Sequence, residues 1–190
     1  MDKIMIFEGQ QRLPALSNFN MIKAFLKTDI KYCILVDFQL AQIGEVIELL
    51  KSNDRKVLVH IDMIRGLSAD EYGAIHLIQN YRVDGIISIK PRVILTCKKR
   101  KVIGMQRVFL KDSISLKRSL EVIEKSQPDC LEILPAVSTP VINYIKDKLK
   151  CEVFSGGLLS TEEQVQACLN AGAIGITVSK PELWLPKKTN

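Results

Sequence analysis

The most informative stretch of this chain is Val153-Phe154-Ser155-Gly156-Gly157, a short apolar run that ends in a pair of glycines. A second run, Gly175-Ile176-Thr177-Val178-Ser179, follows it and ends in hydroxyl-bearing side chains. Nearly continuous apolar runs are typical of strands that are buried on both faces of a parallel sheet. Turns of this kind, placed late in a closed barrel, can hold a phosphate group with backbone amides. The two runs therefore predict neighbouring strands beside a phosphate site.

Six similar runs precede these two, and segments with helical spacing separate them. The six runs are residues 13–16, 32–36, 56–62, 85–88, 102–107 and 130–134. The unit repeats about every 18–28 residues, roughly the length of one strand and one helix. Eight units favour a closed (β/α)8 barrel, since an open dinucleotide-binding sheet would carry its glycine-rich turn after the first strand. We predict one compact TIM-barrel-like domain over residues 1–190, with short loops and a truncated final helix at 181–185.

Several helix starts carry local signals. Asn18 is a good cap for a helix that runs to Lys27, and Pro91 suits the first turn of the helix after the fourth strand. Further helices are expected over 70–81, over 114–125 with Asp112 or Ser113 as the cap, over 140–149, and from the Thr161 segment onward. Helices are thus predicted to alternate with strands along the whole chain.

The charge balance is moderately basic, with 27 Lys and Arg against 21 Asp and Glu and a formal net charge of +6. Such a balance favours a phosphorylated ligand or a nucleic-acid partner. The run Lys98-Lys99-Arg100-Lys101 concentrates part of the charge. A basic helix end of this kind is more often a solvated end that suits the helix dipole than a nucleic-acid patch.

The chain has no apolar stretch that approaches the ~20 residues needed to span a bilayer, and its first residues lack a signal-peptide pattern. We therefore expect a cytoplasmic protein without a membrane partner. The five cysteines are widely spread and form no CxxC pair, so we expect buried reduced thiols rather than disulfides or a zinc site.

Polar residues follow several strands at their carboxyl ends, which form the functional face of a barrel. We assign a phosphate to Gly156, Gly157 and Ser179, with Arg107 or Lys90 adding positive charge. The glycines can also be a tight turn that needs positive φ, and the cations can pair with a carboxylate such as Asp62 or Glu132. Other polar strand-end residues are Asp37, Ser88, Gln106 and Thr177. Ser179 is the later of the two hydroxyls in its run, so we favour it over Thr177 as a ligand.

Glu132 could accept hydrogen bonds from hydroxyl groups of a ligand or serve as a base. His60 and Asp62 are two residues apart and would share one face of a strand. A hydrogen-bonded pair that orders the pocket is favoured over a metal site, because the other histidine, His76, falls within a predicted helix. His60 could also act as a general base, since a histidine has an unperturbed pKa near ~6.5.

Several sequence blocks together resemble the glycerol uptake operon antiterminator regulatory proteins, and the resemblance covers nearly the whole chain. The blocks are Leu13-Pro14-Ala15, the segment from His60 to Leu67, Asp84-Gly85-Ile86-Ile87-Ser88, the segment from Gln106 to Ser113, Pro128-Asp129, Glu132-Ile133-Leu134-Pro135, Gly156-Gly157-Leu158 and the segment from Ser179 to Trp184. Ala136, Val178 and Lys180 stand where the family commonly has Gly, Thr and Asn.

The resemblance implies a cytoplasmic (β/α)8-like regulator with no established enzymatic activity, for which we expect no cofactor. It implies that glycerol 3-phosphate is the effector, and we then expect His60, Asp62 and Glu132 to contact its two hydroxyl groups. It also implies that the liganded protein acts on the leader mRNA of glycerol-utilisation genes and lets transcription pass a terminator. Two alternatives stay open at this point: a metabolic barrel enzyme that acts on a small phosphorylated sugar or polyol, with His60 and Glu132 as acid and base, and a ligand-binding scaffold that acts through a protein partner. The oligomeric state is also open, with a homo-oligomer as one option.

Overall fold

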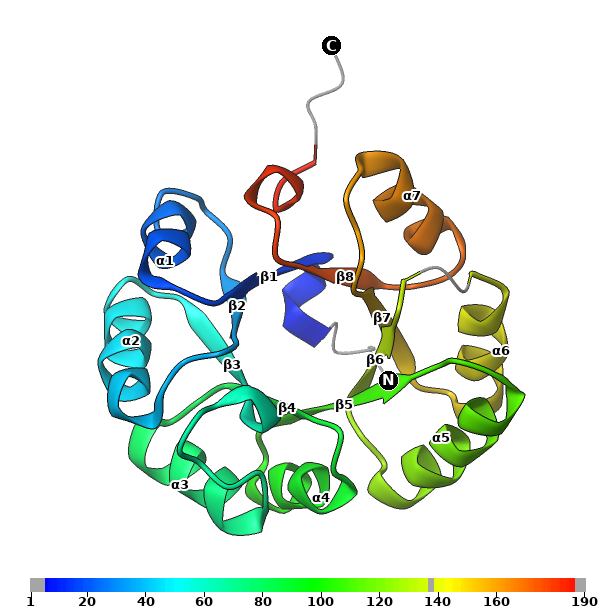
Figure 1. Cartoon of the computed structure of the whole chain (residues 1–190), viewed down its shortest axis with the longest axis horizontal. Coiled ribbons are helices and arrows are strands. Elements are labelled where there is room, and N and C mark those ends of the chain that lie inside the picture. The colour runs from blue at the N-terminus through cyan, green and yellow to red at the C-terminus, as the bar shows by residue number, and fades with distance from the viewer. Residues whose placement is uncertain (1–5, 137–138, 187–190) are drawn as a thin grey trace.

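The computed structural model describes residues 6–136 and 139–186 and contains a closed barrel of eight parallel strands. The strands follow one another around the barrel in chain order, and β8 closes it against β1 (Figure 1). They are β1 (Arg12–Leu16), β2 (Tyr32–Leu35), β3 (Lys56–His60), β4 (Gly85–Ser88), β5 (Ile103–Phe109), β6 (Cys130–Leu134), β7 (Glu152–Gly156) and β8 (Gly175–Val178). The predicted (β/α)8 architecture is confirmed.

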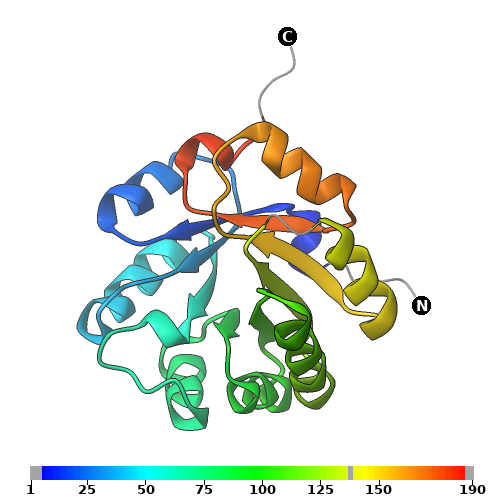
Figure 2. The same cartoon turned by 45° about the vertical axis from the view of Figure 1, so that its right-hand side comes forward.

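Helices connect the strands and form an outer ring around the barrel, as the turned view also shows (Figure 2). They are α1 (Phe19–Phe25), α2 (Leu40–Ser52), α3 (Glu71–Tyr81), α4 (Pro91–Arg100), α5 (Ser113–Ser126), α6 (Thr139–Leu149) and α7 (Glu162–Asn170). Between β8 and residue 186, where the described part of the chain stops, the short turn η3 (Pro181–Leu183) follows in place of a full helix, as predicted.

The predicted helix starts are confirmed where a side chain caps the first turn. Asn18, Asp70 and Asp112 each accept a hydrogen bond from the backbone amide three residues later, and Thr161 does the same for Gln164. Pro91 is the first residue of α4. Each cap satisfies an amide that the helix leaves unpaired, so these helix boundaries follow from local sequence.

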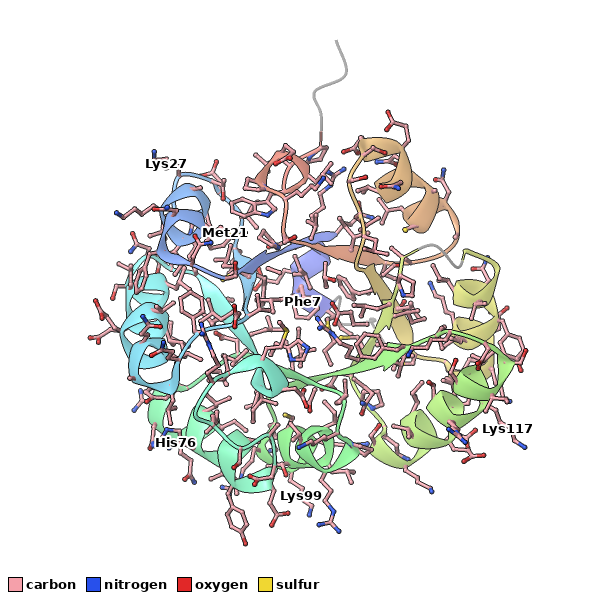
Figure 3. The ribbon with its side chains drawn as sticks, in the orientation of Figure 1. Phe7, Met21, Lys27, His76, Lys99 and Lys117 are labelled. Carbon is pink, nitrogen blue, oxygen red and sulfur yellow. The ribbon has the colours of Figure 1, made fainter. Side chains whose placement is uncertain are left out.

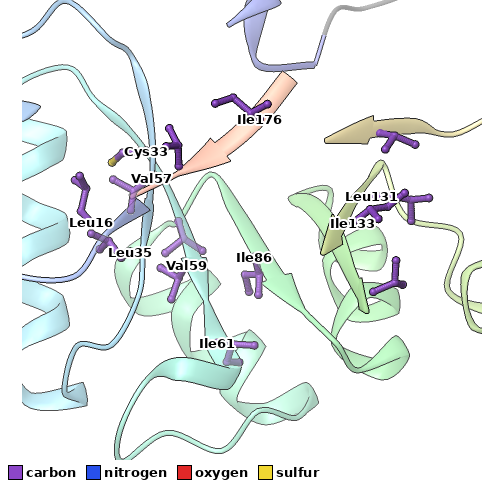
Figure 4. Close-up of a cluster of buried hydrophobic side chains, with 14 of the residues drawn as sticks. Leu16, Cys33, Leu35, Val57, Val59, Ile61, Ile86, Leu131, Ile133 and Ile176 are labelled. Atoms are coloured by element: carbon purple, nitrogen blue, oxygen red, sulfur yellow. The ribbon is translucent and has the colours of Figure 1, made fainter. Parts of the chain in front are cut away.

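The main core lies between the strands and the helices. Leu131, Ile133, Ile86 and Val59 belong to it, and all are nearly inaccessible to solvent (Figure 4). Burying a side chain of this size contributes about 1.5–3 kcal/mol relative to leaving it exposed. This layer holds the helices against the barrel and fixes where each strand ends.

A second apolar cluster fills the interior of the barrel from its amino end. Leu58, Met105 and Phe154 point inward, and Phe7 from the turn η1 (Ile6–Gly9) lies among them. The ring of Phe7 packs edge-on against the rings of Tyr32 and Phe154, and its centroid lies 5.3 Å from the centroid of each. Figure 3 places Phe7 near the middle of the barrel. The amino end is therefore closed by a side chain from outside the strands, which the sequence did not predict.

Several strand ends differ from the prediction: β2 and β5 end at Leu35 and Phe109 rather than at residues 36 and 107, and two further differences bear on the site. β3 ends at His60, and Asp62 belongs to the short turn η2 (Ile61–Met63) rather than to the strand. β7 extends to Gly156, so only Gly157 lies in the turn and only Gly157 has a positive φ, of 77°. The expected Gly-Gly turn is thus one strand residue followed by one turn residue.

Candidate ligand site at the carboxyl end of the barrel

A layer of polar groups lies above the apolar interior, at the carboxyl ends of the strands. Alternation along each strand continues the inward face from Leu58 to His60 and from Met105 to Arg107. The same rule turns Glu132 on β6 and Thr177 on β8 inward, two residues after Cys130 and Gly175. Arg107 is paired in register with Glu132, and Gly156 with Thr177, so these strand ends are neighbours.

Glu132 is the centre of this layer and is fully buried. Arg107 donates to both of its carboxylate oxygens, from Nε to Oε2 at 2.5 Å and from Nη2 to Oε1 at 3.1 Å. The hydroxyl of Thr177 donates to Oε1 at 2.5 Å. A buried carboxylate is costly unless it is paired and hydrogen-bonded, and the two-pronged guanidinium contact with the added hydroxyl meets that need. Of the carboxylates weighed for Arg107, the structure selects Glu132.

His60 is buried in the same layer, with 2% of its surface exposed. Neither ring nitrogen has a hydrogen-bond partner among the residues that the structure describes, although Nδ1 lies 3.5 Å from Oδ2 of Asp62. Burial, together with the positive charge of Arg107, lowers the pKa of His60 to about 3. The imidazole is therefore neutral near pH 7 and presents one donor and one acceptor, both unused within the described part of the chain.

The two carboxylate oxygens of Asp62 lie in different surroundings. Oδ2 accepts a hydrogen bond from the amide of Ile89 at 3.1 Å and so ties the loop after β3 to the turn after β4. Oδ1 is buried and has no partner within the described ranges. Buried polar atoms are seldom left unpaired in folded proteins, so Oδ1 and the His60 nitrogens mark a place where a polar ligand or water is expected.

The two glycines are explained by packing against side chains of the same layer. A Cβ on Gly156 would collide with Oγ1 of Thr177 and would lie 3.2 Å from Oε1 of Glu132. A Cβ on Gly157 would lie 3.2 Å from Cδ2 of Leu134. Gly156 therefore makes room for the hydrogen bond from Thr177 to Glu132, and Gly157 supplies the left-handed turn. Their part in holding a phosphate stays a prediction.

The remaining predicted residues lie at the rim. Ser179 directly follows β8 and is exposed, whereas Thr177, which we ranked below it, points into the barrel and is bonded to Glu132. Lys90 is exposed and precedes the first turn of α4. The roles of Ser179 and Lys90 as phosphate ligands remain predictions.

Other polar strand-end residues do not join the layer. Gln106 and Ser88 occupy the opposite strand face and are buried, with Nε2 of Gln106 donating to the carbonyl of Ser88 at 3.1 Å. Asp37 is exposed and pairs with Arg65 at 3.4 Å.

Within the described ranges, no group of three His, Cys, Asp or Glu side chains is placed to hold a metal ion.

Four of the five cysteines are buried and Cys151 is half-buried, and all five are free thiols. Burial raises the pKa of Cys97 and of Cys151 to about 12, so these thiols stay protonated at neutral pH. The prediction of buried, unpaired cysteines is confirmed.

In the part of the chain that the structure describes, no helix combines the length and the apolar character needed to cross a membrane.

The closed (β/α)8 barrel and the buried polar layer at the carboxyl ends of its strands define a barrel protein whose candidate site lies on the face where such barrels carry their functional residues. The family model for glycerol-3-phosphate responsive antiterminators matches residues 13–184. The chain belongs to this family, which confirms the resemblance seen in the sequence.

Two solved structures and one curated relative are similar to the chain. The glycerol uptake operon antiterminator regulatory protein from Listeria monocytogenes has 33% identity and a TM-score of 0.91, over 95% of this chain and 97% of that one. A glycerol uptake operon antiterminator-related protein from Thermotoga maritima has 26% identity and a TM-score of 0.81, over 92% and 98%. The uncharacterized protein YgcP from Escherichia coli is 29% identical over 77% of each chain. The family is named for a regulator rather than for an enzyme.

Proposed function

We propose that the protein binds glycerol 3-phosphate in the polar layer at the carboxyl end of the barrel and, in that state, acts as an antiterminator on the leader mRNA of glycerol-utilisation genes. The family supports the effector and the regulatory role. The observation that carries the site assignment is the buried imidazole of His60, because neither ring nitrogen has a partner within the described residues.

The chemistry of the layer suits a small polyol phosphate. A hydroxyl can both donate and accept, so it can pair with the neutral imidazole of His60 and with Oδ1 of Asp62. Glu132 can accept a further hydroxyl. The phosphate would lie toward Gly156, Gly157 and Ser179, with Arg107 and Lys90 supplying positive charge. Since Arg107 is paired with Glu132, a phosphate that binds the guanidinium must compete with that carboxylate.

The same layer is poorly suited to general acid–base catalysis. A general base works best when its pKa is near the operating pH, and the pKa of His60 is lowered to about 3. Glu132 already accepts hydrogen bonds from Arg107 and Thr177. These two features favour a sensor over an enzyme that turns over a phosphosugar.

The test measures the affinity of a leader RNA by fluorescence anisotropy with and without glycerol 3-phosphate, over a series of salt concentrations. We expect the ligand to raise RNA affinity by about 5–150-fold, the usual range of coupling between two sites. Affinity should fall as salt rises, since contacts to RNA phosphates release counterions. Glycerol and inorganic phosphate, added separately, are the matched controls. Equal RNA affinity with and without glycerol 3-phosphate would refute the sensor, and steady turnover of a phosphosugar would establish the enzyme instead.

A further inference from the structure

The basic charge of the chain is concentrated in one sector of the barrel. The segment 89–127, which contains α4, β5 and α5, carries eleven of the 27 Lys and Arg but only three of the 21 Asp and Glu, a net charge of +8. The other residues therefore carry 16 basic and 18 acidic side chains, a net charge of −2. In Figure 3 Lys99 and Lys117 point away from the barrel on α4 and α5. A polyanion is expected to approach the molecule from this side.

A cavity of about 600 Å³ opens in this sector, between the turn after β4 and the start of α5. We call it the β5–α5 groove. Six of the residues that line it are Ile89, Arg107, Phe109, Lys111, Ile114 and Arg118. Phe109 is 48% exposed, and Ile89 and Ile114 are 45% and 64% exposed, so apolar groups face solvent between basic ones.

The basic side chains of the groove are available to a ligand. Neither Lys111 nor Arg118 forms a salt bridge within the residues that the structure describes. Asp112 also lines the groove, but its carboxylate caps α5 by accepting the amide of Ser115 at 2.7 Å. Hydrogen bonds from Ser115 lower the pKa of Asp112, and the charge of Arg118 adds to this effect. No salt bridge within the described residues holds Lys111 or Arg118, so the groove offers two cations beside an exposed aromatic ring.

We infer that the β5–α5 groove binds a single-stranded segment of RNA, and this inference rests on the proposed function. Lys111 and Arg118 would contact backbone phosphates, and a base would stack on Phe109. Grooves for single strands combine a positive wall with aromatic side chains in this manner. An exposed apolar surface between cations suits bases, which have apolar faces, better than it suits the charged side chains of an acidic peptide.

The other basic cluster, residues 98–101, is a weaker candidate. It lies at the opposite end of α4, where cations complement the helix dipole. Lys98 is already bound to Oε1 of Gln127 at 2.7 Å. The cavity beside Lys98 has balanced charge, because the carboxylates of Glu124, Asp129 and Glu152 line it together with Lys98, Lys148 and Lys150.

Arg107 connects the groove to the ligand layer. Its guanidinium is paired with Glu132 inside the barrel, and the residue also lines the groove. A phosphate that draws Arg107 toward the barrel axis changes the charge and shape of the groove wall. Binding of the effector can therefore change the affinity of the groove for RNA by moving the side chain of Arg107.

Two double variants with the same change in charge test the groove. Lys111→Glu/Arg118→Glu reverses two positive charges of the groove, and Lys99→Glu/Arg100→Glu reverses two positive charges of the cluster at residues 98–101. The probe is a fluorescein-labelled oligouridylate of about 12 nucleotides, within the site sizes of single-strand grooves. We expect the groove variant to lose at least about 30-fold in affinity and to lower the salt slope by roughly 1.4, as for two lost phosphate contacts on a single strand. The control should lose less than about threefold.

A second pair of variants tests stacking. Phe109→Leu should weaken binding roughly tenfold, a loss typical for one stacked base. Tyr144→Leu is the matched control, because Tyr144 is 49% exposed but lies on α6 outside the sector. It should have no effect on RNA binding. An unchanged melting temperature would show that each variant is folded, and unchanged affinity for glycerol 3-phosphate would show that it still binds the effector.

The outcomes separate the two proposals. If the wild-type protein binds neither the oligonucleotide nor the leader RNA at any ligand concentration, the proposed function fails. If it binds RNA and the groove and control variants lose affinity equally, or the control loses more, the groove inference is overturned. Tighter binding of a polyglutamate peptide than of the oligonucleotide at equal salt would also overturn it in favour of an acidic protein partner.

Discussion

The two ends of the barrel differ in what fills them. At the amino end, Phe7 packs against Tyr32 and Phe154 in a buried apolar cluster. At the carboxyl end, the interior holds a buried carboxylate, a guanidinium and an imidazole whose nitrogens are unpaired within the described residues. The first arrangement gives stability, whereas the second costs stability unless a ligand uses it. The proposed ligand site and the apolar cluster thus lie at opposite ends of the barrel. Replacing the imidazole at the carboxyl end by an apolar side chain should therefore change stability in the opposite direction to removing an apolar ring at the amino end.

The largest effect is expected at the amino end. Phe7→Ala removes a ring that is 2% exposed and leaves a cavity among Tyr32, Leu58 and Phe154. The free energy of unfolding should fall by about 3 kcal/mol, as is usual for a buried phenylalanine. Urea denaturation measures the loss, and calorimetry should show unchanged affinity for glycerol 3-phosphate. A stability loss below about 1 kcal/mol, or a large loss of ligand affinity, would break the separation of the two ends.

A somewhat smaller effect is expected where Gly156 meets Thr177. Gly156→Ala places a methyl group against Oγ1 of Thr177 and should cost about 2 kcal/mol through overpacking. It should also lower ligand affinity, because the shift disturbs the bond from Thr177 to Glu132. Thr177→Ala in the same chain removes the clash, so the double variant should recover most of the stability loss that Gly156→Ala adds. Strictly additive effects in this cycle would contradict the packing explanation.

The dependence of stability on pH should report the buried imidazole. The pKa of His60 is about 3 in the folded protein, against ~6.5 in an unfolded chain, so the unfolded state binds the extra proton between these values. Stability should therefore fall on acidification, by about 1.4 kcal/mol per pH unit between roughly pH 5.5 and 4 from this group alone. His60→Leu should lack that part of the slope in urea titrations at each pH. Identical slopes in the two proteins would show that His60 carries no such penalty.

The smallest change in stability is expected for the same variant near pH 7. His60→Leu replaces a buried, unpaired imidazole by an apolar side chain of similar size, so the ligand-free protein should gain about 1 kcal/mol. Affinity for glycerol 3-phosphate should nevertheless fall at least tenfold. His76→Leu on α3 is a control outside the layer. A variant that is destabilised and still binds the ligand normally would place His60 among the structural residues.

The comparison of the two ends also explains what could be predicted from the sequence. The strands and most helix starts could be found because their signals are local: continuous apolar runs, and caps such as Asn18, Asp70 and Thr161. Phe7 could not be found, since the turn that carries it has no periodic pattern and its place is set only by the barrel it enters.

The sequence offered both Asp62 and Glu132 as carboxylates for Arg107, and the structure shows the pair with Glu132; the bond from Thr177 to Glu132 was not predicted. Inward and outward faces depend on where each strand ends, and this separates Arg107 from Gln106 and Thr177 from Ser179. One extra strand residue at the end of β7 changes the role of Gly156 from a turn to a packing contact. These details depend on the register between strands, which a single sequence does not specify.

Nuclear magnetic resonance of the histidine side chains tests the central assignment most directly. The chain has two histidines, and His76 lies on the outer side of the barrel, where Nδ1 is 2.7 Å from Nδ2 of Asn80 (Figure 3). With ¹⁵N-labelled imidazoles, titration with glycerol 3-phosphate should shift the His60 ring signals to saturation and leave those of His76 in place. Saturable binding by calorimetry without any change at His60 would contradict the account.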